Sequence, residues 1–118
     1  MARPDYLDYQ AEITAKEREK LVNWLVLIQV EFRLLPETLF ITVNIIDRYL
    51  SHKRVPIKIL QLLGIAALFI ASKFQEIYPP ILSDLIEMTR KTYTSQQLLA
   101  METKVLQVIE FDVNCSPS

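Results

Sequence analysis

Residues 60–71 read LQLLGIAALFIA, and this stretch decides the fold. Placed on a helix, it is apolar on every side, with one glycine and three alanines among the larger aliphatic side chains. A helix that is apolar all round must be surrounded by other helices, and small side chains let those neighbours approach closely. The stretch therefore predicts the central helix of a bundle, running from about Pro56 to Lys73.

Two helices are predicted before the central one. The first opens at Thr14, because Thr14-Ala15-Lys16-Glu17 has the T-x-x-E form of a capping box, and it ends near Arg33. The second starts at Pro36, whose missing amide hydrogen costs nothing in a first helical turn. Their predicted inner faces are Leu21, Trp24, Leu25, Ile28 and Phe32 in the first, and Leu39, Val43, Ile46 and Leu50 in the second.

Two more helices are predicted after the central one. Pro79-Pro80 breaks the chain, and a short fourth helix follows at about residues 82–89. The fifth begins with a second capping box, Thr94-Ser95-Gln96-Gln97, and its helical period ends after Phe111. Its predicted inner face is Leu98, Met101, Val105 and Val108.

These patterns predict an all-α fold, a single five-helix bundle over residues 14–112 with a buried central third helix. Residues 1–13 have no helical period, and we expect them to lie extended over the bundle, anchored by Tyr6, Tyr9 and Ile13. Residues 113–118 are expected to form a flexible tail, or a linker to a second bundle that the chain does not contain.

The composition excludes several classes of site. A formal net charge of -1 removes the electrostatic footprint of a dedicated nucleic-acid binder. One Cys and one His exclude an internal disulfide and any metal cage built from several of these residues. The single Gly excludes glycine-rich phosphate loops. Since the lone His52 has no evident catalytic partner, we predict no enzyme activity, no cofactor and no small-molecule substrate.

The start of the chain and its apolar runs bear on location. Charged sequence follows Met1 directly, so no signal peptide is evident. The longest uncharged apolar-rich run, Ile59–Ser72, is shorter than the ~20 residues that span a bilayer. We therefore predict an intracellular protein of the nucleus, the cytoplasm or both, without membrane contact.

Several strings in the chain stand out as a set: LVNWL at 21–25, LLPETL at 34–39, IIDRYLS at 45–51, LQL at 60–62, ASKFQEIYPP at 71–80, TYT at 92–94 and VIEFD at 108–112. Together they resemble the cyclin box of the A- and B-type mitotic cyclins. The resemblance extends from about Tyr6 to Asp112 without gaps. It implies a five-helix cyclin-box bundle and a non-catalytic subunit that binds and activates a cyclin-dependent protein kinase in cell-cycle control. Such a subunit turns the kinase C helix inward, which sets the kinase's Lys–Glu ion pair.

The resemblance also implies roles for individual residues. Arg18 and Asp47 match the structural ion pair that ties the first helix to the second. Lys73 and Glu102 match the pair at the kinase-facing edge, and Ile70, Phe74 and Phe111 match apolar positions that line the slot for the kinase helix. On the residues alone, both charged pairs also fit ordinary salt bridges, and the two phenylalanines also fit a simple core.

One surface departs from the family pattern. Many cyclins dock Arg-x-Leu motifs of substrates and inhibitors in an apolar groove on the first helix. The chain keeps Leu21, Trp24, Leu60 and Gln61 at groove positions, but Glu17 and Lys20 replace apolar residues and Leu27 replaces an acid. Two charges in an apolar groove, and the loss of the carboxylate that would pair the arginine, predict impaired docking.

A second function class remains open at this point. The same fold also serves as a protein-interaction module that does not activate a kinase, as in transcription-factor or pocket-protein folds or a kinase binder without activation. A DNA-contacting version would need a basic face, and the charge balance disfavours it.

Overall fold

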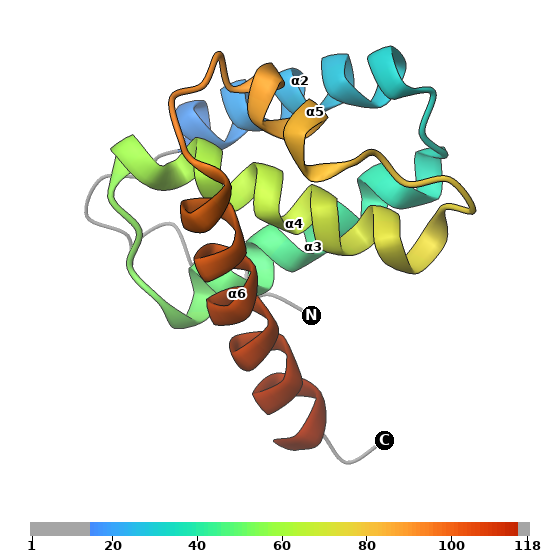
Figure 1. The fold of residues 1–118 in the computed structure, drawn as a ribbon. Helices are drawn as coiled ribbons and strands as arrows, with labels where there is room; N and C mark the ends of the chain where they lie inside the picture. The colour runs from blue at the N-terminus through green and yellow to red at the C-terminus, as the bar shows by residue number, and fades with distance from the viewer. Residues whose placement is uncertain (1–14, 116–118) are drawn as a thin grey trace.

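The computed structural model describes residues 15–115, with side chains described as far as residue 109. The elements in chain order are α2 (Ala15–Phe32), α3 (Pro36–His52), the 3-10 turn η1 (Ile57–Ile59), α4 (Leu60–Gln75), α5 (Leu82–Met88) and α6 (Ser95–Cys115). Residues 15–115 contain five α-helices and no strand (Figure 1). The prediction of an all-α, five-helix bundle is confirmed.

Helix α4 is the centre of the bundle, as the sequence predicts. It contacts α2, α3, α5 and α6, and Figure 1 shows it running through the middle of the molecule. Every residue from Leu62 to Leu68 is buried. The single glycine, Gly64, allows close approach of α2, because a β-carbon there would lie 2.8 Å from Cδ1 of Leu21.

Two predicted boundaries are wrong. The third helix does not start at Pro56: Ile57–Ile59 form a 3-10 turn, and α4 begins only at Leu60 after the kinked backbone of Ile59. The last helix does not end near Phe111 but continues to Cys115. Residues 113–115 contain no helix breaker, and the first one after Phe111 is Pro117, which disfavours helix at the residue before it.

Part of the sequence prediction lies outside the described residues. This applies to the extended segment 1–13 with Tyr6, Tyr9 and Ile13, to Thr14 of the first capping box, and to residues 116–118. The second capping box is confirmed: the Thr94 backbone N–H donates to Oε1 of Gln97 at 2.8 Å, and the Gln97 N–H donates to Oγ1 of Thr94 at 3.1 Å.

The inner face of α3 agrees with the prediction at Ile46 and Leu50, which are buried, but differs from it in the first two turns of the helix. Leu39 and Val43 are only half-buried, whereas Thr38 and Thr42 are fully buried. Threonine can be buried here because both hydroxyls are satisfied: Thr42 donates to the Thr38 carbonyl at 2.7 Å, and Thr38 donates to the Glu76 carboxylate. The predicted faces of α2 and α6 are correct, with Leu25, Ile28, Leu98 and Val105 fully buried.

Two helices end without the glycine that usually closes them. Arg33 after α2 has φ 54°, its N–H donates to the Val30 carbonyl at 3.2 Å, and the Leu34 N–H donates to the Gln29 carbonyl at 2.9 Å. This pair of bonds is a Schellman motif, with Arg33 in the left-handed position. Arg90, with φ 56°, ends α5 in the same way. Such strained positions persist only when the surrounding packing determines them, and Leu34 is buried to 6% exposure.

The stretch Ile57–Gln75 is the one described segment with the length and apolarity of a membrane span. In the bundle 61% of that window is buried. Burial by neighbouring helices accounts for its apolar character.

Candidate functional site

Lys73 and Glu102 form an ion pair that joins the last turn of α4 to α6. Their side chains are 46% and 11% exposed, so the carboxylate is nearly buried and the ammonium remains open to solvent. The Lys73 ammonium also lies 4.2 Å from the centre of the Phe69 ring. The structure therefore brings together the two residues that the sequence assigned to one edge.

An apolar notch with a volume of about 410 Å³ is lined by the same two helices, α4 and α6, together with α3, and its lining includes Phe74, the residue next to Lys73 in the chain. We define it by its lining: Ile41, Asn44, Ile45 and Arg48 of α3, Ile70, Ala71 and Phe74 of α4, and Leu106 and Ile109 of α6. Two of the three predicted slot residues, Ile70 and Phe74, line it. Phe111 belongs to α6, but its side chain is outside the described residues.

Sequence reasoning missed the contribution of α3 to the notch. Ile41, Asn44, Ile45 and Arg48 recur at the three- and four-residue spacing of one helix face, which was a usable signal. Leu106 and Ile109 likewise follow each other at a spacing of three on α6. Residue spacing identifies one face of each helix. It does not show which faces of α3, α4 and α6 meet, because that depends on the packing angles of the bundle.

Large apolar side chains are exposed at and just beyond the notch. Phe74 is 83% exposed, and after the end of α4 Ile77 and Tyr78 are 86% and 90% exposed. Contiguous exposed apolar surface of this kind marks interaction sites on soluble proteins. The notch and this segment together form a surface suited to an apolar partner.

Glu76 links the end of α4 to the start of α3, two of the three helices that line the notch. Its carboxylate accepts hydrogen bonds from the Leu35 backbone N–H, at 2.7 Å, and from the Thr38 hydroxyl. Leu35 is the N-cap of α3 and supplies no side-chain cap of its own. A carboxylate from the end of α4 therefore caps α3, where the helix dipole also favours negative charge.

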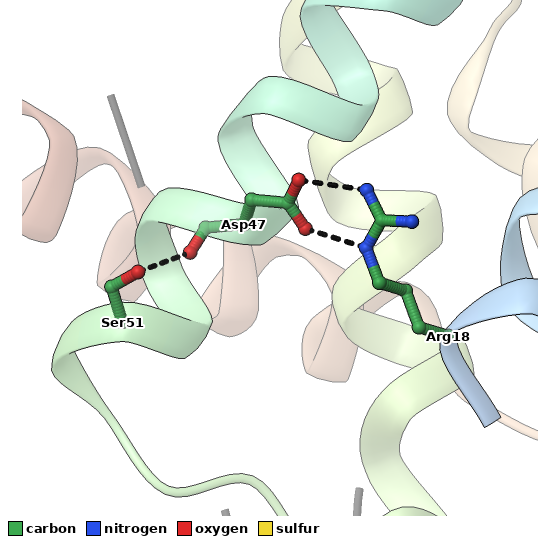
Figure 2. A network of polar contacts seen from close by, with 3 residues as sticks. All are labelled: Arg18, Asp47 and Ser51. Carbon is green, nitrogen blue, oxygen red and sulfur yellow. Dashed lines mark hydrogen bonds and ion pairs between the residues drawn. The ribbon is translucent and has the colours of Figure 1, made fainter. Parts of the chain in front are cut away.

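Arg18 and Asp47 form the predicted bond between α2 and α3. Nε and Nη2 of Arg18 donate to the two carboxylate oxygens of Asp47 at 2.9 and 2.8 Å, the bidentate geometry visible in Figure 2. Ser51 donates its hydroxyl to the Asp47 backbone carbonyl at 2.8 Å, one turn further along α3 (Figure 2). Their position, away from the lining of the notch, supports a structural role.

Most of the predicted docking-groove residues meet in a second hollow, of about 200 Å³, between α2 and α4. Its lining is Glu17, Lys20, Leu21, Trp24, Ile57, Leu60 and Gln61. Leu27 is not part of that lining and is 65% exposed further along α2. Both charged substitutions that the sequence singled out therefore lie in the hollow itself.

The described residues offer no group of three His, Cys, Asp or Glu side chains that could hold a metal ion. The pKa shifts also fall outside the notch lining: burial raises the pKa of the Tyr49 and Tyr93 hydroxyls. His52 is the last residue of α3, and its side chain is exposed.

Comparison with known proteins places the chain in a family. Residues 1–114 match the family model described as "Cyclin, N-terminal domain". The chain is 50% identical over 109 residues to "G2/mitotic-specific cyclin-B1" of Anguilla japonica, and 51% identical over 106 residues to "Cyclin-B1-3" of Arabidopsis thaliana. These alignments cover 92% and 90% of the chain but 27% and 26% of the relatives. The chain thus spans about a quarter of their length.

A solved structure shows the same fold. The X-ray structure of a viral cyclin from herpesvirus saimiri superposes with a TM-score of 0.82 at 29% sequence identity, covering 90% of this chain and 46% of the viral chain. Together with the family match over nearly the whole sequence, this confirms the resemblance found in the sequence strings. The chain belongs to the cyclin family, where it matches the N-terminal domain.

Proposed function

We propose that this chain is the kinase-binding part of a cyclin-like regulatory subunit, which binds a cyclin-dependent protein kinase and activates it in the mitotic cell cycle. The observation that carries the proposal is the Lys73–Glu102 ion pair at the edge of an open apolar notch. Two B1-type cyclins at about half identity support the assignment to cell-cycle control.

The notch suits an amphipathic helix of the partner. A helix in a groove buries a few apolar side chains at three- and four-residue spacing, and the notch offers aliphatic walls from three helices. The exposed ring of Phe74 supplies an apolar anchor at one side. The half-exposed Lys73 ammonium can donate to carbonyl oxygens at the end of that helix, which would set its register.

The proposed role is positioning, with the chemistry left to the kinase. A subunit that turns a kinase helix inward needs a stiff surface, because ordering a mobile surface would offset its binding energy. Buried residues of α4 and α6 support the notch from behind, and the carboxylate of Glu76 holds α3 against α4. These contacts favour a regulatory function over a catalytic one.

A binding titration with a mitotic cyclin-dependent kinase tests the proposal, combined with a histone phosphorylation assay. Phe74→Ala should weaken binding at least ~10-fold, because an aromatic anchor in an interface is often worth ~2 kcal/mol or more. The matched control is Phe40→Ala on α3, which is 71% exposed but absent from the notch lining. Equal affinities for the two variants would contradict the site.

The phosphorylation assay separates the two function classes. Kinase activation by the wild-type chain, reduced by Lys73→Ala, supports an activating cyclin. Binding without any rise in histone phosphorylation would support the alternative, a cyclin-fold module that binds a kinase or another protein without activating it.

We further propose that docking of Arg-x-Leu motifs is impaired in this chain. Glu17 and Lys20 contribute charge to the hollow between α2 and α4, and a motif's apolar side chain would have to desolvate them. Leu27 offers no carboxylate to a motif's arginine. The retained Leu21, Trp24 and Leu60 give the hollow its floor but do not compensate for these charges.

A peptide titration tests the impairment. An Arg-x-Leu peptide should bind the wild-type chain far more weakly than the triple variant Glu17→Met, Lys20→Ile, Leu27→Glu. The control is the double variant Lys16→Ile, Glu19→Met, which places the same kinds of side chain at two exposed positions of α2. Its affinity for the peptide should not exceed that of the wild type. Low-micromolar binding by the wild type would overturn this part of the proposal.

The proposed setting is intracellular, in the nucleus, the cytoplasm or both, without nucleic acid or membrane as partner. The burial of Ile57–Gln75 inside the bundle and the near-zero net charge support it.

A further inference from the structure

The Lys73 side chain is held by two groups of its own chain. Glu102 on α6 pairs with its ammonium, and the ring of Phe69 lies 4.2 Å away on α4 itself. Phe69 is four residues before Lys73, so both side chains project from the same face of the helix. The ammonium lies over the face of the ring, where the negative quadrupole attracts a cation.

The two contacts constrain different motions of a flexible side chain. A lysine has a four-carbon stem with many rotamers, and a single carboxylate leaves that stem free to pivot about the ion pair. The ring limits this pivoting because it holds the ammonium from a second direction. The Phe69 contact is also independent of α6, because Phe69 and Lys73 both belong to α4.

We propose that Phe69 is a positioning residue, which holds the Lys73 ammonium at the edge of the notch before the partner arrives. The inference rests on the proposed function, since it assigns a role in partner binding. Its physical basis is preorganisation: a lysine that is already oriented loses little further freedom when it donates to the partner.

Phe69 also packs against the core, so the experiment must separate positioning from packing. Phe69→Leu keeps an apolar side chain but removes the π face, and Phe69→Tyr keeps the π face. The matched control is Phe32→Leu on α2. Phe32 is also partly buried against the core, but the lysine ammonium contact described here is made with the ring of Phe69.

The first measurement uses the free protein and needs no kinase. In ¹H–¹³C NMR spectra, the ring current of Phe69 should shift the ε-methylene protons of Lys73 upfield. We expect this shift in the wild type and in Phe69→Tyr, and its loss in Phe69→Leu but not in Phe32→Leu. An unchanged Lys73 resonance in Phe69→Leu would overturn the inference.

The second measurement is a double-mutant cycle on kinase affinity. Phe69→Leu should weaken binding about three- to tenfold, in the range of one cation–π contact, and Phe69→Tyr should restore it. In a Lys73→Met background, Phe69→Leu should have no further effect, because it acts only through the ammonium. An equal loss in both backgrounds would mean that Phe69 acts by packing, and would overturn the inference.

The two measurements separate failure of the inference from failure of the proposed function. If the wild-type chain binds no kinase, the proposed function fails and so does the role in binding. The NMR shift still reports whether Phe69 orients Lys73.

Discussion

Arg18 and Asp47 show what a single pair of side chains does in this bundle. The pair is partly exposed, at 32% and 19%, and its two parallel hydrogen bonds join helices that are separated by a loop. The sequence predicted the partners only through the resemblance, because charged residues 29 positions apart carry no local signal of contact. The Thr94–Gln97 capping box, in contrast, was predicted from four consecutive residues.

Removing one partner of the Arg18–Asp47 pair should destabilise the fold. We expect Arg18→Met to lower the free energy of unfolding by about 1–3 kcal/mol, because bidentate charge-assisted bonds are stronger than neutral ones and these are only partly screened by solvent. Urea denaturation measures the change. The control is Lys91→Gln, which breaks a 3.8 Å pair with Glu87 whose side chains are 75% and 65% exposed, and which should cost less than ~0.5 kcal/mol. Similar losses for both variants would contradict this account.

The buried hydroxyl of Tyr93 gives a prediction on pH. Burial raises the pKa of Tyr93 above 10.0, outweighing a smaller opposite effect of a backbone hydrogen bond at Leu62. The hydroxyl donates to the Lys58 carbonyl at 2.7 Å and must stay protonated to do so. The native state thus binds this proton more tightly than the unfolded chain, so its stabilising effect is complete below pH 10 and is lost as the pH rises through the folded-state pKa.

Urea denaturation from about pH 8 to 11 measures this loss. Tyr93→Phe should be less stable at the lower pH and should show a flatter decline above pH 10, whereas Tyr78→Phe, at a 90% exposed ring, should follow the wild type. A Tyr93→Phe curve parallel to the wild-type curve would contradict the assignment.

At the scale of helices, most of the secondary structure follows from sequence periodicity. Capping boxes, prolines and the spacing of apolar residues predicted five helices and the inner faces of α2 and α6. The inner face of α3 was predicted only in part: Ile46 and Leu50 are buried as expected, but the burial of Thr38 and Thr42 depends on hydrogen bonds that only the folded chain provides. The cap that Glu76 supplies to α3 was missed for the same reason, since it joins residues about 40 positions apart.

The Glu76 cap makes a testable contribution to helix α3. Glu76→Gln removes the negative charge from the helix N-terminus while keeping a carbonyl acceptor, so we expect a loss of about 0.5–2 kcal/mol. The matched control is Glu37→Gln in the first turn of α3, where the residue is exposed. Thermal unfolding at low and high salt should show that Glu76→Gln loses more stability than Glu37→Gln, and that added salt makes this loss smaller. Identical behaviour of the two variants would show that the Glu76 carboxylate does not cap α3.

At the scale of the whole molecule, the buried helix α4 contributes residues to both the notch and the second hollow. Residues of α4 line the notch through Ile70 and Phe74 and the second hollow through Leu60 and Gln61. The sequence predicted this central helix because it is apolar on every side. It did not predict how α3, α4 and α6 meet around the notch, which is set by their close packing.

Close packing around α4 should make it intolerant of larger side chains. Ala67 is fully buried, and Ala67→Leu should destabilise the fold by about 1–3 kcal/mol, since extra methylenes force neighbouring side chains and backbone to shift. Ala100→Leu, at an exposed position of α6, serves as control and should be nearly neutral. Denaturant midpoints measure both. A neutral Ala67→Leu would mean that the bundle is loosely packed and lacks the stiffness the proposed role needs.

The central claim is that the notch beside Lys73 and Glu102 binds the kinase. Methyl NMR of the chain during titration with a cyclin-dependent kinase tests it most directly. The account predicts that the methyl resonances of Ile41, Ile70, Leu106 and Ile109, which line the notch, shift or broaden, while those of Leu21, Ile57 and Leu60, in the second hollow, stay unchanged. Perturbation confined to the second hollow, or an unchanged notch at saturating kinase, would contradict it.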